Sequence, residues 1–331
     1  MDSIRFGRTG LRVSRLCLGT MTFGLQCDAA QSNAILDAAA AGGVNFLDTA
    51  DVYPLGGGHN TAGRTEQIVG DWLKGKRHNF ILATKCAGAM GRNPWNQGTS
   101  RKHVLEAIDE SLKRLGTDYV DLYQLHRHDP HTPLDETLEA LDTVVKSGKA
   151  RYVGVSNWPA HKVARALGRS ELKNIAHVAS VQPRYNMLFR SYERDLLPMC
   201  EEEGIAVIPY NPIAGGLLTG KHNAKAPPPE GSRFQLGSAG ARYQERYWHS
   251  REFETIDAVR PIAAEAGMSM ATLAVRWVMS NPAITSPIIG ASKPEQLADS
   301  LAAAEQGPLP EDLKKRLDDI TREWRAVDAE R

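Results

Sequence analysis

The strongest constraint on this chain is a repeated alternation of short apolar runs with longer amphipathic stretches. Eight runs are predicted to be strands, at residues 16–21, 44–53, 80–86, 119–126, 150–157, 178–186, 205–212 and 283–292. Stretches with helical spacing follow these runs, except that the seventh opens into a long irregular stretch. Strands that alternate with helices pair in parallel, because a parallel connection needs a crossover. Eight such units are typical of a closed (β/α)8 barrel.

The main alternative is an open, doubly wound parallel sheet. Such a sheet usually binds a dinucleotide through a GxGxxG turn after its first strand, whereas the first predicted strand here ends in Gly19-Thr20-Met21. We therefore predict an α/β fold, a (β/α)8 TIM barrel that forms a single domain over residues 1–331. Residues 3–14 are predicted to form an N-terminal β-hairpin, and extra helices are expected toward the C-terminus, the last over 311–324.

Charge and cysteine content exclude several classes of partner and site. Forty Lys and Arg against 39 Asp and Glu leave a formal charge of +1, which gives no reason to expect nucleic acid or a membrane as partner. Cys17, Cys27, Cys86 and Cys200 are scattered without a CxxC pair, so we expect neither a disulfide framework nor a metal site. The N-terminus has no apolar core of signal-peptide length, and we expect a reducing, cytoplasmic compartment.

Four ionisable residues follow three consecutive predicted strands. Asp48 follows the second strand, Tyr53 lies five residues later in its loop, Lys85 follows the third strand and His126 follows the fourth. Each has an ordinary alternative role: a turn residue for Asp48, a loop aromatic for Tyr53, and a solvated side chain for Lys85 or His126. In a parallel barrel, however, the C-terminal ends of the strands meet on the face that carries active sites. Their joint placement therefore favours a catalytic group.

These four side chains are suited to proton transfer. A phenol has a pKa of about 10 in water, and we expect the charge of Lys85 to lower the pKa of Tyr53 by stabilising its phenolate. Asp48 is expected to keep a buried Lys85 charged, and His126 to hydrogen-bond both the phenol and the substrate. Hydride attack on a carbonyl carbon builds negative charge on its oxygen, toward which Tyr53 and His126 would donate.

The chain resembles the aldo-keto reductase superfamily, and its bacterial and potassium-channel-β-subunit-like branch more than its aldose-reductase branch. The resemblance implies an oxidoreductase that uses NADPH to reduce the carbonyl of a small aldehyde or ketone to an alcohol, or runs in reverse. It places Asp48, Tyr53, Lys85 and His126 on the family's catalytic tetrad, with Tyr53 as the acid. The resembling segments, in family order over almost the whole chain, are FLDTADVY (46–53), ATK (83–85), DLYQLHRHD (121–129), GVSNW (154–158), VQPRYN (181–186), PYNPIAGGLLTGK (209–221) and IIGASKPEQL (288–297).

The resemblance also implies a set of cofactor-binding residues. Ser156, Asn157 and Gln182 match the residues that hold the nicotinamide carboxamide, and Tyr210 matches an aromatic ring that stacks on the nicotinamide. The remaining members are matched to the pyrophosphate loop, to the adenosine-phosphate segment and to the first two strand ends. They are Asn211, Pro212, Ile213, Gly216, Leu218 and Lys221; Gly290, Ser292, Lys293, Gln296 and Ser300; and Gly19, Thr20, Met21 and Asp48.

The adenosine end of this set leaves two alternatives open. Lys293 offers a positive charge for a 2′-phosphate at the start of a predicted helix, whose free N–H groups favour an anion. The same SKPEQL segment is also an ordinary helix start with proline in its first turn, so NADH stays an alternative to NADPH. The chain has Asp299-Ser300 where the family often carries Glu-Asn, and the shorter side chains put the adenine contact of Ser300 in doubt.

GGLLTGK (215–221) nearly matches a phosphate-binding P-loop. His222 stands, however, where Ser or Thr would bind magnesium. The segment also follows the seventh strand of a barrel pattern. We therefore do not expect nucleotide hydrolysis.

Aromatic residues after several strands are candidates for an apolar substrate pocket. A long loop is expected over 222–250, whose Tyr243, Tyr247 and Trp248 could close over a ligand. Any of these aromatic rings could instead pack the loops together. The candidates for the pocket itself are Phe23, Trp95, Trp158 and Tyr185.

Two functions from other classes compete with carbonyl reduction. A barrel lyase could use Lys85 as a Schiff-base amine, although pairing with Asp48 would make that amine a poor nucleophile. A cofactor-loaded binding subunit is the other alternative, which the channel-subunit resemblance allows. The sequence leaves the physiological substrate, the direction of reaction and self-association open.

Overall fold

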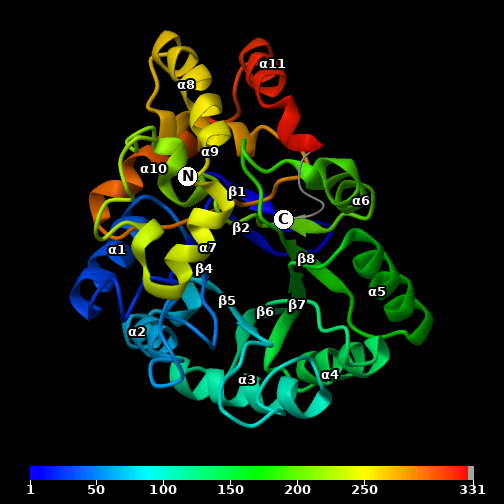
Figure 1. Ribbon diagram of the computed structural model, residues 1–331. Helices are drawn as coiled ribbons and strands as arrows, with labels where there is room; N and C mark the ends of the chain where they lie inside the picture. The colour runs from blue at the N-terminus through cyan, green and yellow to red at the C-terminus, as the bar shows by residue number, and fades with distance from the viewer. Residues whose placement is uncertain (327–331) are drawn as a thin grey trace.

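The computed structural model describes residues 1–326, which form a parallel eight-stranded barrel ringed by helices (Figure 1). The strands run in the order β10-β3-β4-β5-β6-β7-β8-β9, all in parallel. Hydrogen bonds from the amide of Thr285 to the Val207 carbonyl and from Ile288 to Pro209, at 2.9 and 2.8 Å, join the two ends of this order. The strands are β3 (Cys17–Gly19), β4 (Phe46–Asp48), β5 (Ile81–Cys86), β6 (Val120–Leu125), β7 (Ala150–Ser156), β8 (Val178–Gln182), β9 (Ala206–Val207) and β10 (Ile288–Ile289).

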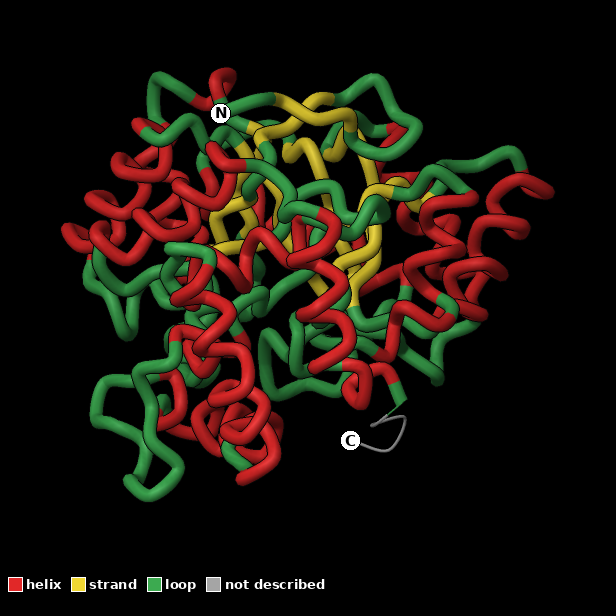
Figure 2. Tube along the Cα trace, turned by 90° about the horizontal axis from the view of Figure 1, so that it is seen from above, coloured by secondary structure: helices red, strands yellow, loops and turns green. Residues whose placement is uncertain are grey.

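Helices follow the strands and cover the outside of the barrel, on both flanks of the strands in the view of Figure 2. Short 3-10 helices, labelled η, occur in several connections. The α-helices are α1 (Ala29–Ala41), α2 (Arg64–Leu73), α3 (Arg101–Leu115), α4 (Leu134–Lys146), α5 (Ala160–Lys173), α6 (Leu196–Glu202), α7 (Gly237–Tyr247), α8 (Ser250–Glu265), α9 (Met270–Met279), α10 (Ala298–Gln306) and α11 (Glu311–Ile320). The 3-10 helices are η1 (Arg77–Asn79), η2 (Ser191–Arg194), η3 (Ala214–Thr219), η4 (Arg233–Gln235), η5 (Pro294–Leu297) and η6 (Arg322–Arg325).

The predicted barrel and N-terminal hairpin are confirmed. β1 (Ser3–Arg5) and β2 (Arg12–Ser14) pair antiparallel, and the hairpin's Phe6 packs edge-on against Phe46, with ring centroids 5.8 Å apart. Phe6 and Val13 belong to the apolar cluster inside the barrel, together with residues from several strands. The hairpin therefore fills the N-terminal end of the barrel, and the opposite end carries the loops that follow the strands.

The side-chain alternation of the strands decides what points into the barrel. Cys17 and Phe46 belong to the interior cluster, whereas Leu18 and Leu47, one residue further on, pack in the outer layer against the helices. Because side chains alternate with a period of two, Asp48 points inward like Phe46. The interior apolar cluster thus gives way to a carboxylate at the C-terminal end of β4.

The stretch over 222–250, expected as a loop, contains a helix. Ala239, Tyr243 and Tyr247 lie four residues apart and are all buried, so they form one apolar face of α7. Glycines at 237 and 240 and the lack of a side-chain N-cap hide this spacing in the sequence. Two further helices, α8 and α9, complete the connection from β9 to β10.

Two further observations concern the whole molecule. Among residues 1–326, no helix combines the length and the apolar character that crossing a membrane requires. The four cysteines are free and buried. The predicted single domain over 1–331 includes residues 327–331, which lie outside the described residues.

Candidate active site

A buried lysine stands at the centre of the four side chains singled out in the sequence. Lys85 is the fifth residue of β5 and is fully buried. Its Nζ atom donates to Asp48 Oδ2 at 2.5 Å, to the Thr49 carbonyl at 2.8 Å and to the Tyr53 hydroxyl at 3.4 Å. The barrel therefore brings Asp48, Lys85 and Tyr53 into one hydrogen-bonded group, although they lie on two different strands and their loops.

Charge balance within this group keeps the lysine protonated. Burial alone would lower the pKa of Lys85, but the charge of Asp48 and the contact with Tyr53 outweigh burial, and the pKa is raised above its usual value. Asp48 Oδ1 also accepts hydrogen bonds from the side-chain amides of Gln124 and Gln182, at 3.0 and 2.9 Å. Asp48 is thus held between a cation and two amides.

The phenol of Tyr53 behaves differently from the expectation drawn from the sequence. Burial raises its pKa, and the positive charge of Lys85 acts in the opposite direction without overcoming that effect. The expectation that Lys85 lowers the pKa of Tyr53 on balance is therefore wrong for the protein alone, because desolvation of the phenolate is the larger effect. Tyr53 stays protonated around neutral pH.

His126 follows β6 directly and faces Tyr53. The two rings meet edge to face, with centroids 5.7 Å apart. Among the described residues, the Tyr53 hydroxyl and the His126 imidazole do not form a hydrogen bond with each other. Burial, and then the nearby charges of Lys85, Arg127 and Arg242, lower the pKa of His126 well below its usual value. The imidazole is therefore neutral at neutral pH.

Gln124 belongs to this group, and sequence reasoning missed it. It lies two residues before His126 on β6, so its side chain points to the inside of the barrel. It is fully buried and accepts a hydrogen bond from the Gln182 amide at 3.1 Å. The alternation of β6 could have identified this residue, because a glutamine inside a barrel needs polar partners.

A cavity of about 1000 Å³ opens at this end of the barrel. Tyr53 and His126 line it, while Lys85 lies behind Asp48 and Tyr53. Every residue expected at the cofactor lines this cavity except Leu218, which is fully buried, and Lys293, the N-cap of η5. Those that line it are Gly19, Thr20, Met21, Asp48, Ser156, Asn157, Gln182, Tyr210, Asn211, Pro212, Ile213, Gly216, Lys221, Gly290, Ser292, Gln296 and Ser300.

Hydrogen bonds hold the polar residues next to the tetrad in place. The Ser156 hydroxyl donates to the Gln182 carbonyl at 2.8 Å. The amide of Asn157 donates to the His126 carbonyl at 3.0 Å, and its oxygen accepts from the Tyr210 hydroxyl at 2.8 Å. Asn157 thereby links the loops after β6, β7 and β9 around the inner part of the cavity.

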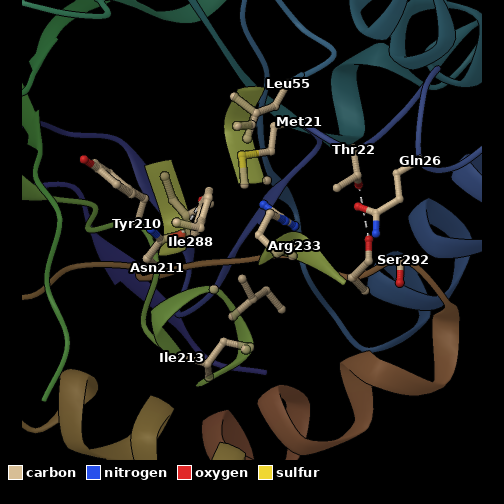
Figure 3. Close-up of a pocket in the computed structure, with 18 of the residues that line it drawn as sticks. Met21, Thr22, Gln26, Leu55, Tyr210, Asn211, Ile213, Arg233, Ile288 and Ser292 are labelled. Atoms are coloured by element: carbon tan, nitrogen blue, oxygen red, sulfur yellow. Dashed lines mark hydrogen bonds between the residues drawn. The ribbon is translucent and has the colours of Figure 1, made fainter. Parts of the chain in front are cut away.

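Cations and a free amide line the outer part of the cavity. Figure 3 shows the Arg233 side chain extended into it, with Met21 and Leu55 along one wall and Asn211 and Ile213 along another. Lys221 also lines the cavity. The buried Nδ2 atom of Asn211 has no hydrogen-bond partner among the described residues, which leaves a donor available to a ligand. Arg233 was not expected from the sequence, because it lies in the stretch read as an irregular loop.

None of the four aromatic residues expected at the substrate lines the cavity. Phe23 is fully buried in the outer core, and Trp158 packs edge-on against His128. Tyr185 stacks near Trp277 and donates its hydroxyl proton to Glu193 at 2.7 Å. Trp95 is 51% exposed. The first three are used to pack loops and helices together.

Three aromatic residues, Tyr243, Tyr247 and Trp248, were expected to close over a ligand. Tyr243 lines the cavity, whereas Tyr247 and Trp248 do not. Its hydroxyl donates to Asn211 Oδ1 at 3.1 Å. Tyr247 accepts from the Asn186 amide at 3.1 Å, and Trp248 packs on Phe234. These contacts fix α7 above the loop after β9.

The described residues can also be compared with the side-chain groupings that bind metal ions. Over 1–326, no three His, Cys, Asp or Glu side chains are grouped so that they could hold a metal ion. The polar groups at the cavity include the carboxylate of the Lys85–Asp48 pair, several phenols, two imidazoles, amides and guanidinium groups, together with the carboxylates of Glu230 and Asp299. This set suits proton transfer and the binding of an anionic ligand.

Comparison with known proteins identifies the family of the chain. The model of the Aldo/keto reductase family matches residues 15–322. The chain is 37% identical to the "Uncharacterized oxidoreductase YrpG" of Bacillus subtilis, over 97% of this chain and 96% of that protein. It is 37% identical to a "Probable voltage-gated potassium channel subunit beta" of Oryza sativa, over 93% of each chain. It is 35% identical to "Protein tas" of Escherichia coli, over 91% of this chain and 92% of that one. The chain belongs to the aldo/keto reductase family of oxidoreductases.

Proposed function

We propose that this chain is a cytoplasmic, NADPH-dependent reductase that converts the carbonyl of a small aldehyde or ketone to an alcohol. One observation carries the proposal. A buried ammonium group, Lys85, is paired with Asp48 and lies within hydrogen-bond distance of a phenol at the wall of a large cavity. A phenol next to a fixed positive charge is suited to give a proton to an oxygen on which negative charge develops.

The residues present fit the proposed cofactor. Amide and hydroxyl groups of Ser156, Asn157 and Gln182 line the inner cavity and can recognise a carboxamide. Lys221 and Arg233 line the outer part, where the phosphates would lie, and the unpaired amide of Asn211 offers one more donor. NADPH bound there would supply the hydride that adds to the carbonyl carbon.

The chain's own residues manage the proton. Tyr53 keeps its proton at neutral pH because burial raises the pKa of its phenol. As the carbonyl oxygen gains negative charge, the hydroxyl of Tyr53 donates its proton to that oxygen. Lys85 then stabilises the remaining phenolate, and Asp48 keeps the lysine charged. The neutral His126 can donate one ring N–H to the same oxygen and orient it.

Replacing Tyr53 with Phe tests the proposed acid. The change removes one hydroxyl and should lower kcat for aldehyde reduction by about 10²- to 10⁴-fold, the usual contribution of a general acid. NADPH binding, followed by the fluorescence of the reduced nicotinamide, should stay within about twofold, because the hydroxyl faces Lys85 inside the barrel. A variant that turns over as fast as the wild type would reject Tyr53 as the proton donor.

The preference for NADPH rests on charge in the outer cavity. Lys221 and Arg233 line it, against Glu230 and Asp299, and guanidinium groups bind phosphates well. The ratio of kcat/KM with NADPH to that with NADH measures this preference. A ratio near one would mean that the 2′-phosphate is not recognised.

The two competing functions remain testable. For Schiff-base chemistry, Lys85 would have to lose its proton. Its Nζ atom, however, donates hydrogen bonds to Asp48 and to the Thr49 carbonyl, which stabilise the protonated amine. Borohydride trapping of a substrate on Lys85 would support that function. The second competing function is a binding subunit, since the rice relative is named as a probable potassium channel subunit. A binding subunit is expected to bind NADPH tightly without repeated turnover on a panel of carbonyl compounds.

A further inference from the structure

One face of α7 is turned toward the cavity and carries two arginines. Ala239, Arg242, Tyr243 and Arg246 all line the cavity. Their spacing of three, one and three residues places them on a single helical face. Arg242 and Arg246 are therefore on the inner side of α7, beside the buried tyrosine, although their long side chains still reach solvent.

The position of this face is fixed by contacts at both ends of the helix. Tyr243 donates to Asn211 Oδ1, and Tyr247 accepts from Asn186. At the start of α7, a Cβ atom at Gly56 would come within 3.2 Å of the Leu236 carbonyl oxygen. Gly56 lies three residues after Tyr53, so α7 begins against the loop that carries the proposed acid. It passes over the barrel in the view of Figure 1.

A third arginine lies in the loop after β6. Arg127 follows His126 directly and also lines the cavity. Burial and then the charges of Lys85, Arg127 and Arg242 lower the pKa of His126. Burial raises the pKa of Tyr210, and the charge of Arg246 opposes that rise. The three arginines therefore line the cavity near His126 and Tyr210. We call Arg127, Arg242 and Arg246 the arginine rim.

The positive charge of the rim is not neutralised by an ion pair within residues 1–326. No ion pair or hydrogen bond joins any of the three guanidinium groups to another residue in the described part of the chain. Three acidic side chains line the same cavity, and two of them are accounted for elsewhere. Asp48 is paired with Lys85, and Asp299 in α10 accepts from the hydroxyl of Ser269, the N-cap of α9. The third, Glu230, lies in the segment just before Arg233 on the cofactor side.

We propose that the arginine rim selects carbonyl substrates that carry an anionic group, a carboxylate or a phosphate. The inference rests on the proposed reductase function and names the substrate class of the same site. With the carbonyl oxygen at Tyr53 and His126, a carboxylate or phosphate on the same molecule would lie against the guanidinium groups. Arginine presents paired N–H donors that match both anions, and clustered positive charge at the mouth of a cleft concentrates anionic ligands.

Matched substrate pairs that differ in charge test this proposal. Succinic semialdehyde is compared with butanal, para-carboxybenzaldehyde with its methyl ester, and glycolaldehyde phosphate with glycolaldehyde. We expect kcat/KM to be higher for the anionic member by roughly tenfold or more at low salt, and the advantage to shrink as ionic strength rises. The first two pairs report on carboxylates and the third on phosphates.

Substitutions then assign the effect to the rim. In the double variant Arg242→Gln and Arg246→Gln, the ratio of kcat/KM for anionic over neutral substrate should fall by roughly tenfold. Arg165→Gln is the matched control, because Arg165 is an exposed arginine on α5 that does not line the cavity, and it should leave the ratio unchanged. Circular dichroism and thermal unfolding confirm that each variant is folded.

A binding measurement keeps this inference separate from the proposed reaction. If no carbonyl compound is turned over, the reductase function fails, and calorimetric titration with benzoate still tests the rim. Benzoate should bind the wild type and the Arg165→Gln variant, and bind the double variant at least about fivefold more weakly. Equal kcat/KM for charged and neutral substrates, or equal benzoate binding in the double variant, would overturn the proposal.

Discussion

Replacing Asp48 with Asn removes the negative charge that faces Lys85 at 2.5 Å while it nearly keeps the shape of the side chain. Both partners are buried, with Lys85 fully inaccessible to solvent. Breaking a buried ion pair from one side leaves an unpaired charge and costs about 3–5 kcal/mol of unfolding free energy. The surrounding donors add to this cost. Gln124 and Gln182 also donate to Asp48, so the NH2 group of an asparagine would face a donor whichever way it turned.

The cost should depend on pH in a definite direction. The pKa of Lys85 is raised in the folded protein, so the stability that it contributes is fully present below the pKa of an unfolded lysine. That stability is lost as pH rises through the higher folded pKa. In the Asp48→Asn variant the protonated form of Lys85 is left without a negative partner, which lowers the unfolding free energy. This loss of stability disappears when Lys85 gives up its proton. The difference in stability between wild type and variant should therefore be largest near neutral pH and shrink under strongly alkaline conditions.

Urea unfolding of the wild type, Asp48→Asn, Lys85→Met and the double variant measures these quantities. We expect Asp48→Asn to be destabilised by about 3–5 kcal/mol at neutral pH and the double variant to be more stable than Asp48→Asn, because the unpaired ammonium is gone. The reasoning fails if Asp48→Asn matches the wild type at neutral pH, or if adding Lys85→Met destabilises it further.

Three further predictions concern other groups. Asp51 is fully buried, and burial, followed by the charge of Glu66, raises its pKa well above the usual value. The stability that protonated Asp51 contributes is fully present below the pKa of an unfolded aspartate and is lost as pH rises through the folded pKa. Asp51→Asn should therefore increase the unfolding free energy by on the order of 1 kcal/mol at neutral pH, as measured by urea unfolding. For aldehyde reduction, kcat/KM should stay flat through neutral pH and fall only under alkaline conditions, because the pKa of Tyr53 is raised and that of His126 is lowered; a half-maximal rate near neutral pH would contradict this. Trp95→Ala should change the unfolding free energy by less than about 0.5 kcal/mol and leave kcat/KM within about twofold. The reason is that the indole is half exposed and does not line the cavity. A large loss of activity would instead place Trp95 at the substrate.

The positions of the proposed catalytic residues could be predicted because barrel geometry is carried by local patterns. Each strand is marked by a short apolar run, and its C-terminal end is marked by the residue that follows. Asp48, Lys85 and His126 lie at or directly after the ends of β4, β5 and β6, and the closure of the sheet brings these ends together. The same alternation would have identified Gln124, two residues before His126, had buried polar positions inside the strands been considered.

The aromatic residues show where sequence reasoning stops. Tyr185 and Trp158 follow strands just as Tyr53 does, yet they pack loops and helices instead of lining the cavity. The difference lies in partners remote in the chain, such as Trp277 for Tyr185. The residues next to an aromatic side chain in the sequence do not indicate whether its ring will pack against another element or line the cavity.

The sequence alone determined the barrel, the N-terminal hairpin and the residues at the C-terminal ends of the strands, because period-two alternation and helix–strand order are local properties of the chain. Only the tertiary structure decided the balance of forces on those residues. Burial raises the pKa of Tyr53 despite its neighbouring lysine, and the fold of α7 turns Arg242 and Arg246 toward the same cavity as Arg127. Desolvation and the sum of charges depend on every atom around a group, and those atoms are assembled only when distant segments meet.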